Sequence, residues 1–341
     1  MIESISFQNF KALRNTTLPL GRFTLIVGPN GSGKSTALQS PQVAWGVFQA
    51  NSAASLEMYS SAGLQLSQAT PVEVAIRWSD PFAGKISRVR LPSDNPGAVS
   101  HSSESGTALP EHQRRSLMEA LAAIRVYALD ARTIAAAVGL TPGIELGAEG
   151  QGLAGVLDRL RDEEPERFEA LNQEIGRLLP EFDRILFKTP GRGERAFLLR
   201  TREGQYRIRA AELSHGTLLA LAMLTLSYLQ RPPPIIALEE PDRGLHPRLL
   251  LGLRDALYRL SYPESVGESR PPVQVVATTH SPYFLDLFKD HPEEIVIAEK
   301  DGLEARFQRL VDRPDINEIL ADAPLGEVWY SGVLGGVPRK P

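Results

Sequence analysis

The sequence has 341 residues, of which 42% are hydrophobic and 23% are charged. This composition is that of an ordinary globular protein, so it excludes a disordered or fibrous chain, and the length predicts about two domains. The absence of cysteine excludes disulfides, a thiol nucleophile, cysteine-ligated zinc and iron–sulfur clusters. A net charge of −4 argues against a globally basic nucleic-acid-binding surface but leaves a local basic groove open.

The sequence contains no stretch that predicts a membrane segment. Its first residues include Glu3 and no apolar run, so no secretory signal is expected. The longest apolar run, 218–229, is interrupted by Thr225 and Ser227 and is shorter than the ~20 residues that span a bilayer. We therefore expect a soluble, cytoplasmic protein without a membrane partner.

The two ends of the chain show the pattern of an α/β fold. The first 40 residues predict strands at 4–7 and 23–27, then a glycine-rich loop and a helix from Lys34. The last third predicts a buried helix at 218–229 and strands at 235–238 and 273–277. The continuous apolar runs are typical of a parallel sheet covered on both faces, and their alternation with helices predicts an α/β layered fold.

The middle of the chain, 41–204, is expected to form an inserted, mainly helical lobe, while 1–40 and 205–341 form a discontinuous core. A stretch rich in Ser, Gly and Pro near 91–110 is expected to be a mobile loop. The charged segment 153–179 has apolar residues at helical spacing and predicts a pair of surface helices.

A phosphate-binding loop is the strongest motif in the sequence. The pattern G-x-x-x-x-G-K-[ST] is matched in full between a predicted strand and a predicted helix. Its glycines allow successive backbone N–H groups to surround a phosphate at a helix N-terminus. Lys34 can reach the β- and γ-phosphates of a nucleotide, and the Ser35 hydroxyl can bind Mg²⁺. The predicted ATP-binding residues are Gly28, Pro29, Asn30, Gly31, Ser32, Gly33, Lys34, Ser35 and Thr36.

Two carboxylates follow the apolar strand at 235–238. Phosphoryl transfer to water uses one carboxylate near the metal and one that orients or deprotonates the water. Adjacent residues of a strand point to opposite faces, so we assign Glu239 to the Mg²⁺ ligands and Glu240 to the catalytic water. The alternative is a solvated acidic turn before Pro241.

His280 follows the strand predicted at 273–277, at the edge where ligands bind in open α/β sheets. It could donate a hydrogen bond to a γ-phosphate, or it could cap the strand or the next turn. His246 precedes Pro247 and is interpreted as the residue before a helix.

The apolar helix near 218–229 has a start that suits an anion. Ser214 is a good N-cap, and Gly216 allows close approach of another group. The alternative is a capped helix with no further role.

Together these motifs resemble the head of ABC-type ATPases. The segment 5–11, with Asn9-Phe10-Lys11, is similar to the opening of SMC, RecF and OLD-like ATPases. Residues 213–217 stand where transporters have LSGGQ, and 239–247 resembles the EP-x-x-GLHP motif of OLD-like and abortive-infection ATPases. The segment 325–332 is also similar to that group. The resemblance implies a P-loop NTPase fold with a mixed sheet flanked by helices.

The resemblance also implies a mechanism. Two subunits would enclose two ATP molecules with Mg²⁺, and Ser214, His215 and Gly216 of one would contact the nucleotide held by the other. Lys34, Glu240 and His280 would be catalytic, with His280 as the switch histidine. No glutamine between Thr36 and Leu213 stands out as a switch glutamine. Glu239 stands where the family has aspartate.

Three functions compete at this point. The first is an ATP-driven switch that controls a separate effector protein in phage defence or a toxin-like system. It rests on the GLHP motif in 239–247 and on the missing nuclease, because Glu299 and Asp301 lack the later acidic pair of a Toprim site and no coiled coil is present. The second is a RecF-like DNA-binding ATPase in repair or maintenance, supported by seven basic residues in 188–209. For this segment we favour the alternative, the solvated face of a hairpin that turns at Gly204. The third, a transporter subunit, is disfavoured by His215 and Thr217.

Overall fold

The computed structural model describes residues 1–50, 71–91, 100–302, 304–316, 318–319 and 324–335. The chain divides into two compact units. Unit 1 comprises 1–126, 233–238 and 274–341, and unit 2 comprises 127–232 and 239–273.

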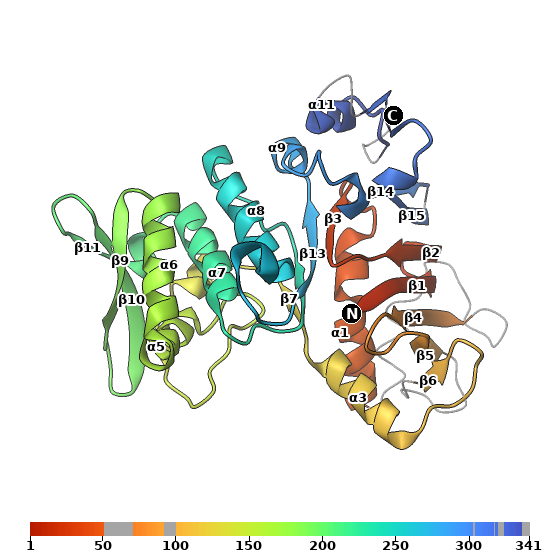
Figure 1. The fold of residues 1–341 in the computed structure, drawn as a ribbon, viewed down its shortest axis with the longest axis horizontal. Coiled ribbons are helices and arrows are strands. Elements are labelled where there is room, and N and C mark those ends of the chain that lie inside the picture. Colours follow the sequence, from red (N-terminus) through yellow and green to blue (C-terminus); the bar gives the residue numbers. More distant parts are fainter. Residues whose placement is uncertain (51–70, 92–99, 303, 317, 320–323, 336–341) are drawn as a thin grey trace. The chain divides into compact units, whose positions relative to one another are not determined.

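A six-stranded sheet carries the phosphate loop and lies in unit 1, except for the last residue of its edge strand β7. Its strand order is β15-β14-β3-β13-β12-β7, and β14, β3, β13 and β12 are parallel (Figure 1). The strands are β3 (Phe23–Val27), β7 (Ile124–Tyr127), β12 (Ile235–Leu238), β13 (Gln274–Thr279), β14 (Ile295–Asp301) and β15 (Glu304–Arg309). All residues of β3, β12 and β13 are buried, which confirms the parallel strands predicted from continuous apolar runs.

A second sheet of unit 1 is antiparallel and has the order β2-β1-β4-β5-β6. Its strands are β1 (Ile2–Phe10), β2 (Leu13–Pro19), β4 (Val72–Trp78), β5 (Lys85–Leu91) and β6 (Ser100–Ser103). Every second side chain of β4 is buried, which is the alternation expected of a sheet with one face in a core. The predicted strand 4–7 is the middle of β1. The observed strand is longer, and it pairs with β2 on one edge and with β4 on the other.

Helix α1 (Lys34–Ala50) begins in the phosphate loop and packs against both sheets. Its residues Ala37 and Leu38 share one buried cluster with Val276 of β13 and Val74 of β4. The same cluster takes in Leu117 of α3 (Glu111–Ala122). The helix that follows the phosphate loop is therefore held between two layers of strands.

Short helices complete unit 1. They are α9 (Pro282–Asp286), η3 (Pro292–Glu294), η4 (Leu310–Asp312) and α11 (Leu325–Tyr330). Helices α9 and α11 pack together: the backbone N–H of Gly326 donates to the carboxylate of Asp286 at 2.6 Å. A Cβ on Gly326 would lie 2.4 Å from the carbonyl oxygen of Pro282, so this close approach requires glycine.

Unit 2 is built on α7, a helix buried on nearly all sides. Its helices are α4 (Ala131–Ile134), α5 (Leu153–Glu163), α6 (Pro165–Leu178), η1 (Ala210–Glu212), α7 (His215–Tyr228), α8 (Pro247–Ser261) and η2 (Pro263–Val266). Helix α7 packs against α4, α6 and α8, and eleven of its fourteen residues are buried. A helix that is apolar all round belongs in a core, so the predicted buried helix is confirmed. Helices α5 and α6 confirm the helix pair predicted at 153–179.

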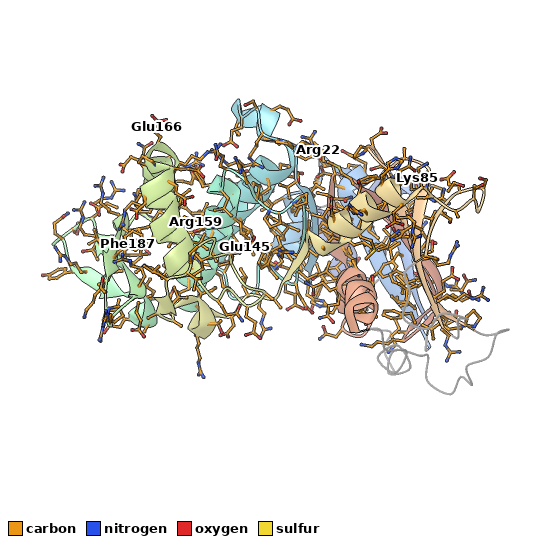
Figure 2. The ribbon with its side chains drawn as sticks, turned by 90° about the horizontal axis from the view of Figure 1, so that it is seen from below. Arg22, Lys85, Glu145, Arg159, Glu166 and Phe187 are labelled. Atoms are coloured by element: carbon orange, nitrogen blue, oxygen red, sulfur yellow. The ribbon has the colours of Figure 1, made fainter. Side chains whose placement is uncertain are left out.

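A small antiparallel sheet covers α5 and α6 within unit 2. It consists of β8 (Val138–Gly139), β9 (Phe182–Lys188), β10 (Glu194–Thr201) and β11 (Arg207–Arg209), with β10 paired to the other three. Figure 2 labels Phe187 on this sheet and Arg159 and Glu166 on the two helices. The ring of Phe187 lies 5.9 Å from that of Phe168, and the Arg161 guanidinium lies 4.5 Å from the Phe187 ring centre.

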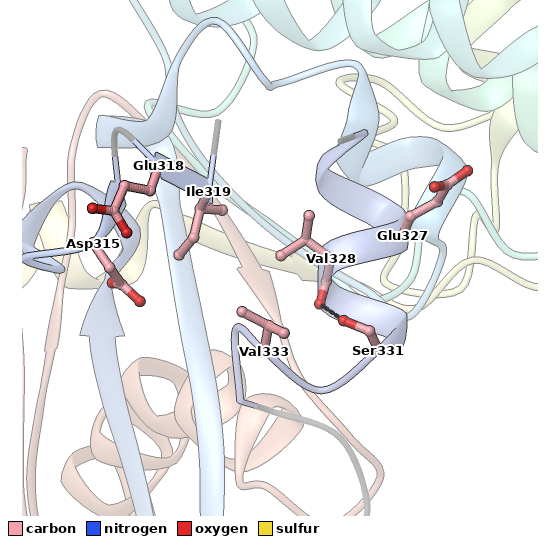
Figure 3. A pocket seen from close by; sticks show the side chains of 7 residues that line it. All are labelled: Asp315, Glu318, Ile319, Glu327, Val328, Ser331 and Val333. Atoms are coloured by element: carbon pink, nitrogen blue, oxygen red, sulfur yellow. Dashed lines mark hydrogen bonds between the residues drawn. The ribbon is translucent and has the colours of Figure 1, made fainter. Parts of the chain in front are cut away.

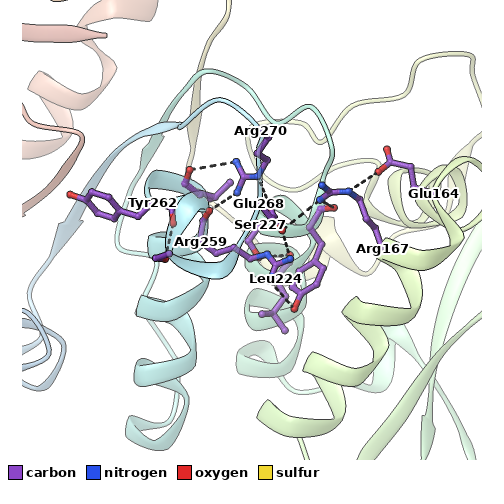
Figure 4. A network of polar contacts seen from close by, with 11 residues as sticks. Glu164, Arg167, Leu224, Ser227, Arg259, Tyr262, Glu268 and Arg270 are labelled. Atoms are coloured by element: carbon purple, nitrogen blue, oxygen red, sulfur yellow. Dashed lines mark hydrogen bonds and ion pairs between the residues drawn. The ribbon is translucent and has the colours of Figure 1, made fainter.

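A charged network ties the helices of unit 2 together (Figure 4). Glu268 forms an ion pair with Arg259 of α8 and accepts a hydrogen bond from Arg270 Nε at 2.6 Å. Arg167 of α6 lies 3.8 Å from the same carboxylate and 3.2 Å from Glu164. Only 12% of the Glu268 side chain and 5% of the Arg270 side chain are exposed. Because solvent screens these charges little, removal of one partner should destabilise unit 2.

The observed units differ from the division expected from the sequence. The stretch 41–204 was expected to be one inserted lobe, but its strands β4, β5 and β6 pair with β1 in unit 1, and its helices α5 and α6 lie in unit 2. Backbone pairing between β1 and β4 leaves no signal in local periodicity, which is why the sequence missed it. Of the loop expected near 91–110, residues 92–99 lie outside the described part, and 100–103 form β6.

None of the described helices is long and apolar enough to cross a membrane.

Candidate nucleotide-binding site

The phosphate loop leaves β3 and turns through two glycines in left-handed conformation. Gly31 and Gly33 have φ angles of +76° and +85°, which other residues adopt only with strain. A Cβ on Gly28 would lie 2.3 Å from the carbonyl oxygen of Ala298, and one on Gly33 would lie 2.7 Å from Leu13 Cδ2. The loop therefore depends on glycine at all three positions.

The interior of the loop fits a phosphate group. Lys34 Nζ donates to the carbonyl oxygens of Gly28 and Pro29, both at 2.9 Å, and Lys34 is only 5% exposed. Ser32 is fully buried, and within the described part of the chain its Oγ has no hydrogen-bond partner. A buried hydroxyl without a partner is unfavourable, and a phosphate oxygen would supply the missing partner. The ammonium, the hydroxyl and the helix N-terminus are the groups that favour an anion.

His280 and the phosphate loop lie together at one edge of the six-stranded sheet. Thr279 of β13 lies opposite Val27 of β3, so His280 and Gly28 leave the sheet at the same level. The cap of the following helix α9 is Ser281, whose Oγ accepts from the Phe284 N–H at 3.2 Å. Ser281 rather than His280 is thus the N-cap of α9.

His246 does have the structural role predicted for it. It is the N-cap of α8, and its Nδ1 accepts from the N–H of Arg248 at 3.2 Å. The start of α8 at Pro247 is confirmed.

The acidic pair follows β12 and belongs to unit 2. The Glu239 N–H donates to the carbonyl oxygen of Tyr127 at 2.8 Å. Glu240 has a φ of +46°, a left-handed conformation that costs about 1–3 kcal/mol for a residue other than glycine. Its carbonyl oxygen accepts from the Arg243 N–H at 3.0 Å, which closes a turn. Strain of this kind is concentrated at functional sites, so the conformation supports a special role for Glu240.

Helix α7 begins as the sequence predicts. Ser214 is its N-cap, and Ser214 Oγ accepts from the Thr217 N–H at 3.1 Å. A Cβ on Gly216 would lie 3.1 Å from the carbonyl oxygen of Gly244. The start of α7 and the loop after the acidic pair are therefore packed backbone against backbone.

A cavity of about 540 Å³ in unit 2 joins these two regions. Glu239 and Glu240 line it together with His215, and Asp130 and Arg243 contribute further charge to its wall. The acidic strand end and the start of α7, which are 23 residues apart or more in sequence, thus face one hollow.

The predicted site residues fall into two groups. Residues 28–36 and His280 come together in unit 1, whereas Glu239, Glu240, Ser214, His215 and Gly216 come together in unit 2. Within the ranges that the structure describes, no three His, Asp or Glu side chains form a ready metal site. Ser35 and Glu239 remain the predicted Mg²⁺ ligands.

The basic segment 188–209 contains the hairpin that the alternative to a nucleic-acid surface predicts, with β10 and β11 joined around Gly204. Arg195 pairs with Asp158 at 2.9 Å and Arg200 with Asp183 at 2.9 Å. Arg209 pairs with Glu212 at 2.5 Å, and Arg202 donates to two backbone carbonyls. Four of the seven basic side chains are thus engaged within the chain, which weakens the case for a nucleic-acid surface.

A second hollow, of about 450 Å³, lies in unit 1 beside α11 (Figure 3). Its lining combines the carboxylates of Asp315, Glu318 and Glu327 with apolar Ile319, Val328 and Val333. Arg313 binds Asp315 at 2.8 Å from outside the lining. No residue predicted for the ATPase site lines this hollow.

The fold and the phosphate loop define a P-loop ATPase, and comparison with known proteins gives its family. The family described as "AAA domain, putative AbiEii toxin, Type IV TA system" matches residues 23–286, and the family described as "AAA ATPase domain" matches residues 1–40. The chain belongs to the first of these families. An OLD nuclease from Thermus scotoductus is 48% identical over 40 residues, which are 12% of this chain and 8% of that protein.

Solved structures of SMC heads share the fold. The SMC head bound to the C-terminal winged-helix domain of ScpA matches with a TM-score of 0.62 at 17% identity, over 90% of this chain and 96% of that one. An SMC head with an extended coiled coil, bound to the C-terminal domain of ScpA derived from Pyrococcus furiosus, matches at 0.57 and 16% identity, over 93% and 98%. The SMC head of Thermotoga maritima matches at 0.52 and 16% identity, over 90% and 98%. The predicted P-loop ATPase fold of the SMC and OLD-like group is confirmed.

The sequence did not reveal the wall of the phosphate loop formed by β14 and β15. Ala298 lies against Gly28, and Ala305 Cβ would lie 3.2 Å from a Cβ on Gly33. Small residues in a strand carry no functional signal by themselves, so only the register of β14 beside β3 identifies them.

Proposed function

We propose that this protein is a Mg²⁺-dependent ATPase that works as a switch: it dimerises around two ATP molecules and controls a separate effector protein. The observation that carries the proposal is the phosphate loop, with its left-handed glycines, buried Lys34 and unsatisfied Ser32 hydroxyl at the end of β3. Such a loop has the chemistry to hold a nucleotide polyphosphate.

Each predicted residue has a task in hydrolysis. Lys34 stabilises the negative charge of the β- and γ-phosphates, and Glu240 orients and deprotonates the attacking water. His280, level with the loop, donates a hydrogen bond to the γ-phosphate and so registers its presence. Mg²⁺, held by Ser35 and Glu239, would neutralise developing charge on the phosphates.

Dimerisation would add the start of α7. Ser214 and Gly216 of one subunit, with His215 beside them, would contact the γ-phosphate held by the other subunit, because a capped helix N-terminus favours an anion. A protein partner is also part of this proposal. It is supported by the SMC heads of similar fold, because two of them were solved bound to a domain of ScpA.

We further propose that the effector belongs to a phage-defence or toxin-like system. The family description names AbiEii toxins of type IV TA systems, and the matching relative over 40 residues is an OLD nuclease. The alternative role, a DNA-binding repair ATPase, would need the basic hairpin, most of whose arginines are engaged within the chain.

Nucleotide binding is tested first with the Lys34→Ala variant. Loss of the buried ammonium should abolish measurable ATP binding in calorimetry while the fold is retained, as checked by circular dichroism. ATP affinity near that of the unmodified protein would refute the phosphate-loop assignment. A matched control is Lys289→Ala, a lysine of the same unit that follows α9.

The partner is tested with tagged Glu240→Gln, which should trap ATP, recovered from the lysate of its own host with ATP present. A stoichiometric nuclease or toxin-like protein, absent when Lys34→Ala is used, would support the switch. DNA or RNA without such a protein would support the repair role instead.

A further inference from the structure

Strand β14 runs past the end of β3 and continues along the phosphate loop. The two strands pair from Ile295 opposite Leu25 to Ile297 opposite Val27. On the edge that faces β3, the residues of β14 beyond Ile297 therefore lie beside the phosphate loop, while their other edge pairs with β15. Ala298 shows this directly, because its carbonyl oxygen would lie 2.3 Å from a Cβ on Gly28.

Lys300 is the next residue of β14 on the same face as Ala298. Side chains two residues apart in a strand point the same way, and a Cβ on Gly31 would lie 3.5 Å from Lys300 Nζ. Lys300 is also opposite Ala305 in the antiparallel pair of β14 and β15. Ala305 lies against Gly33, so the cross-strand neighbour of Lys300 faces the loop too.

The acidic residues of this hairpin lie on the other face. Glu299 and Asp301 alternate with Lys300, and they are opposite Arg306 and Glu304 in the register. Arg306 lies 3.7 Å from Glu304, which places that pair on the face turned from the loop. Within the described ranges, Lys300 itself forms no ion pair with a carboxylate.

We propose that Lys300 is a second phosphate-binding cation of this site, which contacts the nucleotide polyphosphate from the Gly31 side of the loop. Lys34 is buried and bound to the carbonyls of Gly28 and Pro29, whereas Lys300 is exposed and its ammonium is accessible to a ligand. An ammonium beside a polyphosphate forms charge-assisted hydrogen bonds. This proposal rests on the proposed function, since it requires that a nucleotide occupy the loop.

The test compares ATP binding by Lys300→Gln, Lys300→Arg and Arg306→Gln, measured by calorimetry at 50 mM and 500 mM salt. Lys300→Gln should weaken ATP and ADP binding about five- to tenfold at low salt, and the loss should shrink at high salt because the charges are screened. Lys300→Arg keeps the charge and should bind nearly as tightly as the unmodified protein. Arg306→Gln removes a charge from the opposite face and should change affinity less than twofold.

Inorganic tripolyphosphate, which has no base or sugar, tests whether Lys300 contacts the polyphosphate part of the nucleotide. It should compete with ATP about five- to tenfold less well in Lys300→Gln than in the unmodified protein. Unchanged ATP affinity in Lys300→Gln at 50 mM salt, or an equal loss in Arg306→Gln, would overturn the inference. Failure of the unmodified protein to bind ATP would instead overturn the proposed function, so the two failures are distinguishable.

Discussion

Thr279 lies opposite Val27 in the parallel pair of β13 and β3, so His280 and Gly28 begin their loops side by side. This relationship ties the histidine to the phosphate loop through a rigid, fully buried pair of strands. Positions fixed by a sheet are more precise than positions on mobile loops. This position is the reason why we propose that His280 senses a γ-phosphate held in the loop.

The first prediction concerns His280. Replacement by alanine removes a hydrogen-bond donor to the γ-phosphate but leaves Lys34 and the loop in place. We expect ATP turnover to fall at least tenfold, with ADP affinity changed less than threefold, because ADP lacks the γ-phosphate. Steady-state phosphate release and calorimetry measure the two effects. His246→Ala, which alters only a helix cap, should keep its turnover within twofold.

The second prediction separates the two carboxylates. Glu240→Gln keeps the size of the side chain but cannot take a proton from water, so turnover should fall about 100-fold or more while ATP is still bound. The trapped protein should accumulate as a dimer in size-exclusion chromatography with light scattering. If Glu239→Gln traps the dimer and Glu240→Gln hydrolyses normally, the two roles are reversed.

The third prediction concerns the left-handed conformation of Glu240. With φ at +46°, glycine at this position should relieve about 1 kcal/mol of backbone strain relative to glutamine. At Glu239, whose φ is not positive, glycine in place of glutamine should instead lower the free energy of unfolding by about 1 kcal/mol. Urea unfolding of Glu240→Gly, Glu240→Gln, Glu239→Gly and Glu239→Gln gives the difference in unfolding free energy between glycine and glutamine at each position. Equal effects at both positions would show that the turn stores no strain.

The fourth prediction addresses the start of α7. Ser214→Arg places a bulky cation where the N-cap would meet the nucleotide of the other subunit. We expect ATP affinity of the monomer to change less than threefold, because the phosphate loop belongs to unit 1, and ATP-dependent dimerisation to be lost. Ser214→Thr keeps a capping hydroxyl and should still dimerise. A dimer of normal stability in Ser214→Arg would reject the contact between subunits.

The sequence predicted the local elements that carry the candidate site, but not the strand pairing around them. The phosphate loop, β12 and the cap of α7 are local patterns, so their residues could be assigned from spacing alone. The pairing of β1 with β4 and the approach of Lys300 to Gly31 join residues far apart in the chain. Neither has a local signal, because each depends on the register between strands. The segment Asn9-Phe10-Lys11 leads from β1 into β2, and both Asn9 and Lys11 have φ near +50°.

The last prediction is a pH dependence of stability that arises in the antiparallel sheet. His101 of β6 is 7% exposed, its Nδ1 lies 2.9 Å from Ser87 Oγ, and Trp78 Nε1 donates to the same hydroxyl at 2.8 Å. Burial, with a smaller contribution from the charge of Arg114, lowers the pKa of His101 from 6.5 to about 4. The folded protein thus keeps this histidine neutral in a pH range where the unfolded chain protonates it.

The sign of the effect follows from proton binding. Between pH 6.5 and about 4 the unfolded state holds one more proton at His101 than the folded state, so stability falls as the pH falls through this window. The slope from this residue fades to zero as the pH rises above 6.5 or falls below about 4. We expect a loss of about 2 kcal/mol from pH 7 to pH 4.5, seen as the difference between the unmodified protein and His101→Gln in urea unfolding. Carboxylates titrate alike in both proteins, so they cancel in that difference. A difference that stays constant across the window would mean that His101 is protonated as readily in the folded sheet as in the unfolded chain.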